Sequence, residues 1–249
     1  MIKEATCYIN DESVYMKIYQ PDKREGKYPT VILSHGLSLN HTFMIPYAEK
    51  LLKKNIVSIV FDFRGGGYDS KSDGNISDMT LNSEMDDLNK VLDFVRTLDY
   101  VDKDNIYLAG HSQGGLISSL IAPTRSNDIR GLFLFAPAYV IPFDVKEYPD
   151  NMREKNVMRL MPEYLGTTYV ESVNSIDVYN NTISRYDGDV YIFQGKKDTR
   201  VPVSYVIKAG DVISNSHLIL FDDEEHRFTD ETKDVVVDRI SEVIADNRR

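Results

Sequence analysis

The chain has 249 residues, and its 42% hydrophobic content is enough to bury the core of one α/β domain. Its net charge of −10 at pH 7 argues against nucleic acid or an anionic membrane as a partner. No apolar run reaches the roughly eighteen residues of a membrane-spanning helix, and the single Cys7 cannot form an intrachain disulfide.

Residues 1–5 lack the apolar centre of a signal peptide, so we expect the protein to be cytoplasmic. The lone cysteine agrees with a reducing compartment. No repeat or low-complexity segment divides the chain, and we expect residues 1–249 to form a single domain. The oligomeric state is left open, with a homodimer as one candidate.

Patterns of buried strands and amphipathic helices alternate along the amino-terminal part of the chain. Strands are predicted over residues 14–19, 30–34 and 56–61. A helix follows, and its apolar face carries Leu81, Met85, Leu88, Leu92 and Val95. This alternation predicts a mostly parallel sheet covered by helices on both faces.

A glycine triplet, residues 65–67, lies between the third of these strands and the helix. It does not match a dinucleotide-binding fingerprint, because Ser70 stands where the third glycine of that motif would be. The sequence also lacks a His-Glu-x-x-His motif and any cluster of cysteines. We therefore expect neither a cofactor nor a metal ion.

The segment Gly-His-Ser-Gln-Gly-Gly, residues 110–115, joins a strand predicted over 105–109 to a helix with apolar spacing over 116–121. Such a turn holds its serine in a strained conformation with the hydroxyl exposed at the edge of the sheet. The flanking glycines leave room for the neighbouring strand and helix. Ser112 is therefore the candidate nucleophile of a hydrolase.

A catalytic serine needs a base within hydrogen-bond reach and an acid that orients the base. In the fold that this turn implies, acid and base follow in that order, each on a loop after a later strand. After a strand over 131–136, the strand predicted over 190–194 leads to Asp198, and that over 218–221 leads to His226. We therefore predict Asp198 as the acid and His226 as the base.

Two further histidines compete with this assignment. His217 opens its strand and so lies at the opposite end of the sheet from the serine, whereas His111 is expected to point away from it and to pack. The acidic residues 222–225 should favour the protonated form of the base unless they point to solvent. The last predicted helix carries Val236, Ile240 and Val243.

The oxyanion of a tetrahedral intermediate needs hydrogen-bond donors, each contributing roughly 3 to 4 kcal/mol to its stabilisation. The main-chain N–H of Gln113, the residue after the nucleophile, is one expected donor. The second is the N–H of Leu37, because Gly36 lets the chain turn directly after the strand over 30–34.

The segment from Pro137 to Asp187 interrupts the alternation of strands and helices. It contains several prolines, many tyrosines and few long apolar runs. At roughly fifty residues it is too long for a plain connection in a compact domain. We predict a small inserted cap that lies above Ser112 and shapes the acyl pocket.

In chain order, these landmarks resemble those of an α/β-hydrolase: residues 34–36, 62–70, 110–115, 195–198 and 225–226. The similarity spans nearly the whole chain. Within that superfamily the chain most resembles the small bacterial feruloyl (cinnamoyl) esterases, which share the His-Ser-Gln-Gly-Gly turn around the serine, the compact length and a short cap. It differs at the glycine triplet, where those esterases commonly have Gly-His-Gly, and this predicts a more mobile loop.

The resemblance implies an α/β-hydrolase fold and a small-molecule ester as substrate. It makes Tyr169 a candidate to hydrogen-bond the phenolic end of a hydroxycinnamoyl group, with Asp144 as a second candidate. The residues that compete for this contact are Tyr139, Tyr148 and Tyr164.

The predicted reaction is two-step acyl transfer, with a feruloyl-type ester as the expected substrate. A lipase or monoacylglycerol hydrolase and a peptidase or thioesterase of the same fold are alternatives. A ligand-binding module without catalytic activity is the alternative of another class, because this fold also serves receptors. The sequence specifies neither the alcohol part of the natural ester nor a motion of the cap.

Overall fold

The computed structural model describes residues 1–22, 26–147, 165–180 and 182–247. Its strands are β1 (Ile2–Ile9), β2 (Glu12–Tyr19), β3 (Tyr28–Ser34), β4 (Val57–Phe61), β5 (Val101–His111), β6 (Gly131–Phe135), β7 (Asp189–Gly195) and β8 (Ser216–Phe221). Its helices are α1 (Ile45–Lys53), α2 (Leu81–Thr97), α3 (Gln113–Ile121), α4 (Ile141–Glu147), α5 (Thr167–Asn174), α6 (Val203–Val212) and α7 (Asp230–Asp246). Short 3-10 helices span His41–Met44, Ala122–Arg125 and Ile183–Arg185.

The strands form one sheet in the order β1-β2-β4-β3-β5-β6-β7-β8. Strand β2 pairs antiparallel with β1 and β4, and all other neighbours are parallel. Strands β3, β4 and β6 are buried along their whole length, as expected for parallel strands with helices on both faces. The predicted α/β-hydrolase architecture is confirmed.

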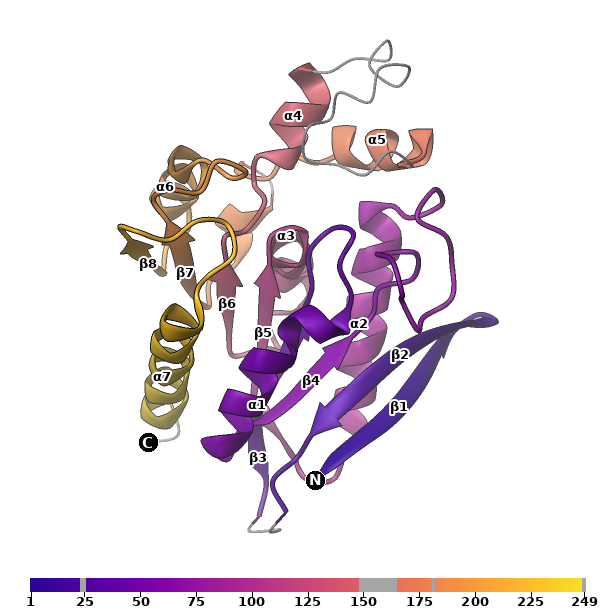
Figure 1. Cartoon of the computed structure of the whole chain (residues 1–249), viewed down its shortest axis with the longest axis vertical. Coiled ribbons are helices and arrows are strands. Elements are labelled where there is room, and N and C mark those ends of the chain that lie inside the picture. Colours follow the sequence, from indigo (N-terminus) through magenta and orange to yellow (C-terminus); the bar gives the residue numbers. More distant parts are fainter. Residues whose placement is uncertain (23–25, 148–164, 181, 248–249) are drawn as a thin grey trace.

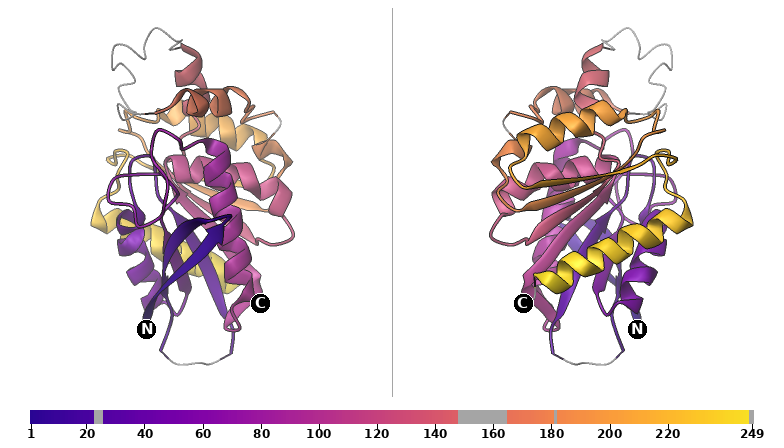
Figure 2. Two further views of the ribbon diagram at one scale, coloured as in Figure 1. Left: turned by 90° about the vertical axis from the view of Figure 1, so that its right-hand side faces the viewer. Right: turned by 90° about the vertical axis from the view of Figure 1, so that its left-hand side faces the viewer.

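Alternate residues of the central strands enter two separate cores. In β3, Val31 and Leu33 belong to the core cluster that includes residues of α1 and α7, whereas Ile32 belongs to the cluster that includes residues of α2, α3 and α6 on the other face. Figures 1 and 2 show these helices on opposite sides of the sheet. No helix in the described part of the chain is long and apolar enough to cross a membrane.

Strand β1 and the helices α1 and α6 were not among the predicted elements. Most residues of β1 are exposed or half-buried, because it is an edge strand, so it lacks the apolar pattern of a buried strand. The predicted strands and helices elsewhere are present. Helix α3 ends at Ile121, just before Pro123, as the sequence indicates.

The segment between β6 and β7 contains α4 and α5, which lie beyond the carboxyl ends of β5 and β6 (Figure 1). Its buried residues Tyr139, Tyr169 and Val173 join the core on the α2 and α3 side of the sheet. The Leu81 N–H, at the start of α2, donates to Ser172 Oγ of α5 over 3.1 Å. The insertion thus packs over the end of the sheet where Ser112 lies.

Candidate active site

Ser112 lies between β5 and α3 in a strained backbone conformation, with φ of 55° and ψ of −119°. Its N–H donates to Phe135 O over 2.9 Å. Its carbonyl oxygen accepts from the N–H groups of Gly115, Leu116 and Ala138. Positive φ in a non-glycine residue costs on the order of 1 to 3 kcal/mol, and these main-chain bonds hold it in place.

The glycines around Ser112 are required by close approaches of the main chain. A Cβ on Gly110 would lie 2.3 Å from Gly114 O, in the first turn of α3. A Cβ on Gly114 would lie 2.4 Å from His35 O, at the end of β3. Strand and helix can therefore meet at the serine only if both positions carry glycine.

His226 connects Ser112 to Asp198 through one chain of hydrogen bonds. Its Nε2 lies 3.0 Å from Ser112 Oγ, and its Nδ1 lies 2.8 Å from Asp198 Oδ2. An Nδ1–H that donates to the carboxylate leaves Nε2 as the acceptor for the serine hydroxyl. The loops after β5, β7 and β8 thus bring the three predicted residues together in the geometry that proton transfer from serine needs.

The carboxylate of Asp198 is buried and fully hydrogen-bonded. Its Oδ1 accepts from the N–H groups of Arg200 and Val201, and its Oδ2 also accepts from Gln194 Nε2 over 2.9 Å. Burial by itself would raise the pKa of Asp198, but the hydrogen bonds from His226 and the other donors outweigh it and hold the pKa below its usual value. Asp198 is therefore ionised and fixed in direction at neutral pH.

Neither competing histidine takes the place of His226 beside the Ser112 hydroxyl. His111 Nε2–H donates to His226 O over 3.0 Å, and burial lowers the pKa of His111 to about 3, so its ring is neutral. It positions the loop that carries the base. His217 lies near the start of β8 and contacts Asp189.

The acidic run before His226 is bonded to other groups. Asp222 pairs with Lys196, and Asp223 pairs with Lys197. Glu224 accepts hydrogen bonds from Thr229 and Thr232 at the start of α7. These carboxylates thus stabilise the loops around the histidine.

The main-chain N–H groups of Leu37 and Gln113 meet no acceptor within the described residues. The loop that carries Leu37 passes close to Ser112, since a Cβ on Gly36 would lie 3.0 Å from Ser112 Cβ. Both predicted oxyanion donors therefore flank Ser112 and are available to a ligand.

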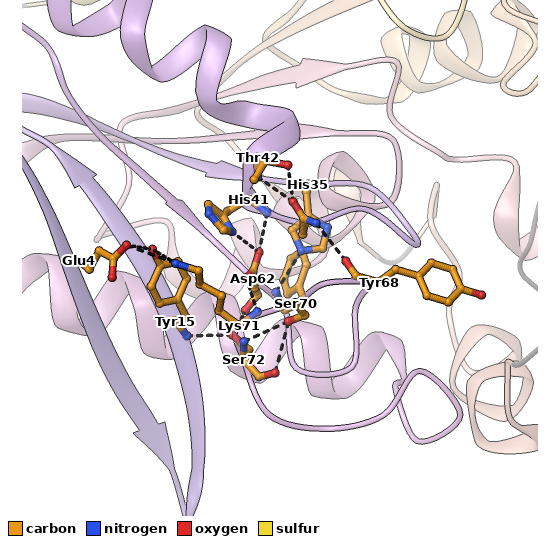
Figure 3. A network of polar contacts seen from close by, with 12 residues as sticks. Glu4, Tyr15, His35, His41, Thr42, Asp62, Tyr68, Ser70, Lys71 and Ser72 are labelled. Atoms are coloured by element: carbon orange, nitrogen blue, oxygen red, sulfur yellow. Dashed lines mark hydrogen bonds and ion pairs between the residues drawn. The ribbon is translucent and has the colours of Figure 1, made fainter.

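Hydrogen bonds join the loop after β3 to the loop after β4, as Figure 3 shows. His35 Nδ1–H donates to Gly36 O, and its Nε2 accepts from the Phe63 N–H. Asn40 Nδ2 donates to Tyr68 O over 3.0 Å. These contacts fix the part of the chain that presents the Leu37 N–H.

Asp62 anchors the far end of this loop (Figure 3). Its fully buried carboxylate accepts from the His41 N–H, from the His41 ring and from the Lys71 N–H. Burial alone would raise the pKa of Asp62, but these donors outweigh it and lower the pKa. A buried negative charge thus organises the main chain beside the loop that carries Leu37.

The glycine triplet fits this packing. A Cβ on Gly67 would lie 1.8 Å from Leu39 O, and Gly65 has φ of 64°. The triplet allows one loop to lie against the other, so a tight main-chain contact accounts for it.

Ser112 and His226 open into a cavity with about 550 Å³ of space between protein atoms, part of it open to solvent. Its described apolar lining consists of Leu37, Leu39, Ala138, Val140, Ile141 and Val201. Asp144, Arg200 and Arg227 add charged groups. Asp144, one of the two predicted substrate contacts, thus lines the same cavity as Ser112.

Tyr169 is placed differently from its predicted role. It is fully buried, is absent from the described cavity lining, and its hydroxyl donates to Gln113 Oε1 over 2.6 Å. A phenol already committed to a buried amide does not fit the predicted contact with a substrate hydroxyl. Tyr139 is likewise buried and bonded to Ser119 Oγ, while Tyr148 and Tyr164 lie outside the described residues.

Glu84 is a residue of this site that the sequence analysis missed. It is buried in the first turn of α2 and accepts from Gln113 Nε2 over 2.7 Å. Burial raises its pKa to about 8, so the side chain is neutral at pH 7. Its position three residues after Leu81 and four before Leu88, on the apolar helix face, was the available signal.

A group of three or more metal-ligating side chains is absent from the described parts of the chain. The sequence profile of the family described as "Serine aminopeptidase, S33" matches residues 27–219. The chain belongs to this family. The S33 match spans the sheet from the start of β3 into β8, including Ser112 and Asp198.

Solved structures share the fold of this S33 family member. Est1E from Butyrivibrio proteoclasticus, determined with ferulic acid bound, has a TM-score of 0.84 at 23% identity and covers 97% of this chain and 98% of its own. Alpha/beta hydrolase domain-containing protein 10 from mouse has a TM-score of 0.76 at 19% identity and covers 98% and 99%.

A curated relative matches over a shorter stretch. The quorum-quenching protein AidA of Acinetobacter baumannii (strain MDR-ZJ06) is 26% identical over 123 residues, which are 49% of this chain and 38% of that protein. The alignment therefore spans well under half of the relative's length.

Proposed function

We propose that the protein is a serine esterase that hydrolyses carboxylic esters through an acyl-enzyme, with hydroxycinnamate esters of the feruloyl type as substrates. The observation that carries this proposal is the hydrogen-bonded chain from Ser112 through His226 to Asp198 at the edge of a cavity. The N–H groups of Leu37 and Gln113 beside it supply the oxyanion site.

In the first half of the reaction, His226 Nε2 takes the proton of Ser112 as Oγ attacks the ester carbonyl carbon. Asp198 stabilises the imidazolium that forms, and the oxyanion accepts from the Leu37 and Gln113 N–H groups. The intermediate collapses as the bond between the acyl carbon and the alcohol oxygen breaks. That oxygen takes the proton from His226 and leaves as the alcohol.

In the second half, a water molecule gives a proton to His226 as its oxygen attacks the acyl-enzyme carbonyl. The second intermediate breaks the bond to Ser112 Oγ, which recovers its proton from the histidine. The acid product then leaves, and the site returns to its starting protonation state.

The residues that line the cavity support the proposal that the acyl group is aromatic and has a polar end. Leu37, Val140 and Ile141 supply apolar surface for a ring, and the Asp144 carboxylate can accept from a phenolic hydroxyl. The ferulic acid bound to the structural relative Est1E supports the same substrate class. Tyr169 makes no contact with the substrate in this proposal.

An ester panel on the purified protein tests the proposal. Methyl ferulate, methyl cinnamate, a short-chain p-nitrophenyl ester, a monoacylglycerol and an aminoacyl p-nitroanilide distinguish feruloyl esterase, lipase and peptidase. The expected result is the highest kcat/KM on methyl ferulate. A preference for the monoacylglycerol or the anilide would replace the proposed substrate with that class.

Labelling with a fluorophosphonate tests the catalytic part separately. An activated serine reacts with this probe, so wild-type protein should be labelled and Ser112→Ala should not. Absence of labelling in the wild type would favour a ligand-binding module.

A further inference from the structure

We propose that Glu84 and Tyr169 are positioning residues for the oxyanion hole and act through the side chain of Gln113. This inference rests on the proposed function, because it concerns the donor that would stabilise the oxyanion. Neither residue lines the described cavity, and both contact the same buried amide.

Gln113 is the first residue of α3, and its side chain is fully buried. Glu84 accepts from its Nε2, and Tyr169 donates to its Oε1, so both ends of the amide are fixed. A residue held at both ends of its side chain has little freedom to turn its main chain. The direction of its N–H is therefore coupled to the two partners.

The start of α3 needs such support because its N-cap residue provides none. N-cap serines usually bind an N–H of the first turn through the hydroxyl, but Ser112 makes no such contact. Its hydroxyl is bonded to His226 instead. The hydroxyl of the N-cap residue Ser112 is thus unavailable to the helix. The buried Gln113 side chain restrains the start of α3 in its place.

Tyr169 ties this restraint to the insertion. It lies on α5, whose Ser172 hydroxyl donates to Tyr169 O and accepts from the Leu81 N–H. A Cβ on Gly166 would lie 2.1 Å from Ser77 O, so α5 packs tightly on the chain before α2. Helices α2, α3 and α5 therefore meet at Gln113, and correct docking of the insertion orients an oxyanion donor.

Tyr169→Phe, with Tyr139→Phe as its matched control, is the test. Both tyrosines are fully buried, and each bonds through its hydroxyl to a polar side chain of α3, but Tyr139 contacts Ser119 and not Gln113. With p-nitrophenyl acetate, Tyr169→Phe should lower kcat about fivefold, with KM within twofold. Tyr139→Phe should leave kcat within twofold despite a similar fall in Tm.

Glu84 is tested by rescue. Glu84→Leu removes the acceptor for Gln113 Nε2 and should lower kcat about tenfold, whereas Glu84→Gln keeps a carbonyl acceptor and should retain most of the activity. Equal losses for both variants would show that the effect is general damage, and would overturn the role of Glu84.

Two further outcomes would overturn the proposal. Equal kcat values for Tyr169→Phe and Tyr139→Phe would remove Tyr169 from positioning. A loss on methyl ferulate with none on methyl cinnamate would make Tyr169 a substrate contact. Ser112→Ala distinguishes failure of the positioning role from failure of the proposed function. Activity retained in that variant contradicts the proposed function itself, whatever the tyrosine variants show.

Discussion

The loops after β5, β7 and β8 and the insertion between β6 and β7 line the same cavity, but different forces hold them. Ser112 is fixed by main-chain bonds to Phe135 of β6, to Ala138 and to its own helix, and Asp198 also accepts main-chain N–H groups. Helix α5 is held by the side chains of Tyr169 and Ser172. Main-chain bonds at the strand ends therefore hold Ser112 and Asp198, whereas side-chain bonds help to dock α5.

The largest expected effect comes from the first region. Ser112→Ala should lower ester hydrolysis by at least about four orders of magnitude, because no other group can form the acyl-enzyme. Circular dichroism and Tm should be close to wild type, since the bonds that hold residue 112 come from its main chain. Retention of more than a few per cent of activity would contradict the assignment of the nucleophile.

This difference between the regions explains what the sequence could predict. Strand ends and chain order suffice to place Ser112, Asp198 and His226, because parallel strands deliver successive loops to one edge of the sheet. The direction in which the Tyr169 side chain points depends on how α5 docks against α2. No local sequence pattern specifies that docking. The burial of Glu84 was not predicted, because acidic side chains are normally charged and exposed, whereas a raised pKa keeps this one neutral.

Alanine substitutions of glycine compare the two regions directly. In Gly114→Ala, the new Cβ would lie 2.4 Å from His35 O, so β3 and α3 must separate and hydrolysis should fall by roughly a hundredfold or more. In Gly166→Ala, the clash is with Ser77 O, outside the sheet, and we expect a loss of about tenfold. Fluorophosphonate labelling rates and Tm would measure both effects.

Gly210→Ala is the control for this pair. Its Cβ would meet only Ser216 Oγ at 3.8 Å, an ordinary contact, and the position lies inside α6. Activity should be unchanged and stability equal or slightly higher. If Gly166→Ala were as damaging as Gly114→Ala, the insertion would be as closely coupled to the chemistry as the sheet is.

The buried acid between the two regions predicts a dependence of stability on pH. The pKa of Glu84 rises from 4.5 to about 8 in the folded protein, so between these values the folded state holds a proton that the unfolded state has released. Its contribution is complete below pH 4.5 and is lost as pH rises towards 8, by up to about 1.4 kcal/mol per pH unit. Glu84→Gln removes this loss.

Urea unfolding at pH 5 and pH 8 measures this effect. The stability of Glu84→Gln relative to wild type should increase between the two pH values by a few kcal/mol, on the order set by the same linkage. Glu171→Gln, at an exposed position of α5, should show no such increase. An equal difference at both pH values would mean that Glu84 does not hold a proton in the folded state.

The smallest expected effect lies in the insertion itself. Asp144→Asn replaces a charged acceptor with a neutral amide, which weakens a hydrogen bond to a phenol by about 1 kcal/mol. The kcat/KM for methyl ferulate should therefore fall about fivefold relative to methyl cinnamate, which has no ring hydroxyl. Because Asp144 lies on α4, away from the bonds that fix the serine, kcat/KM on p-nitrophenyl acetate should stay near wild type. An equal fall on all three esters would mean that α4 acts through the shape of the cavity and not through contact with the substrate hydroxyl.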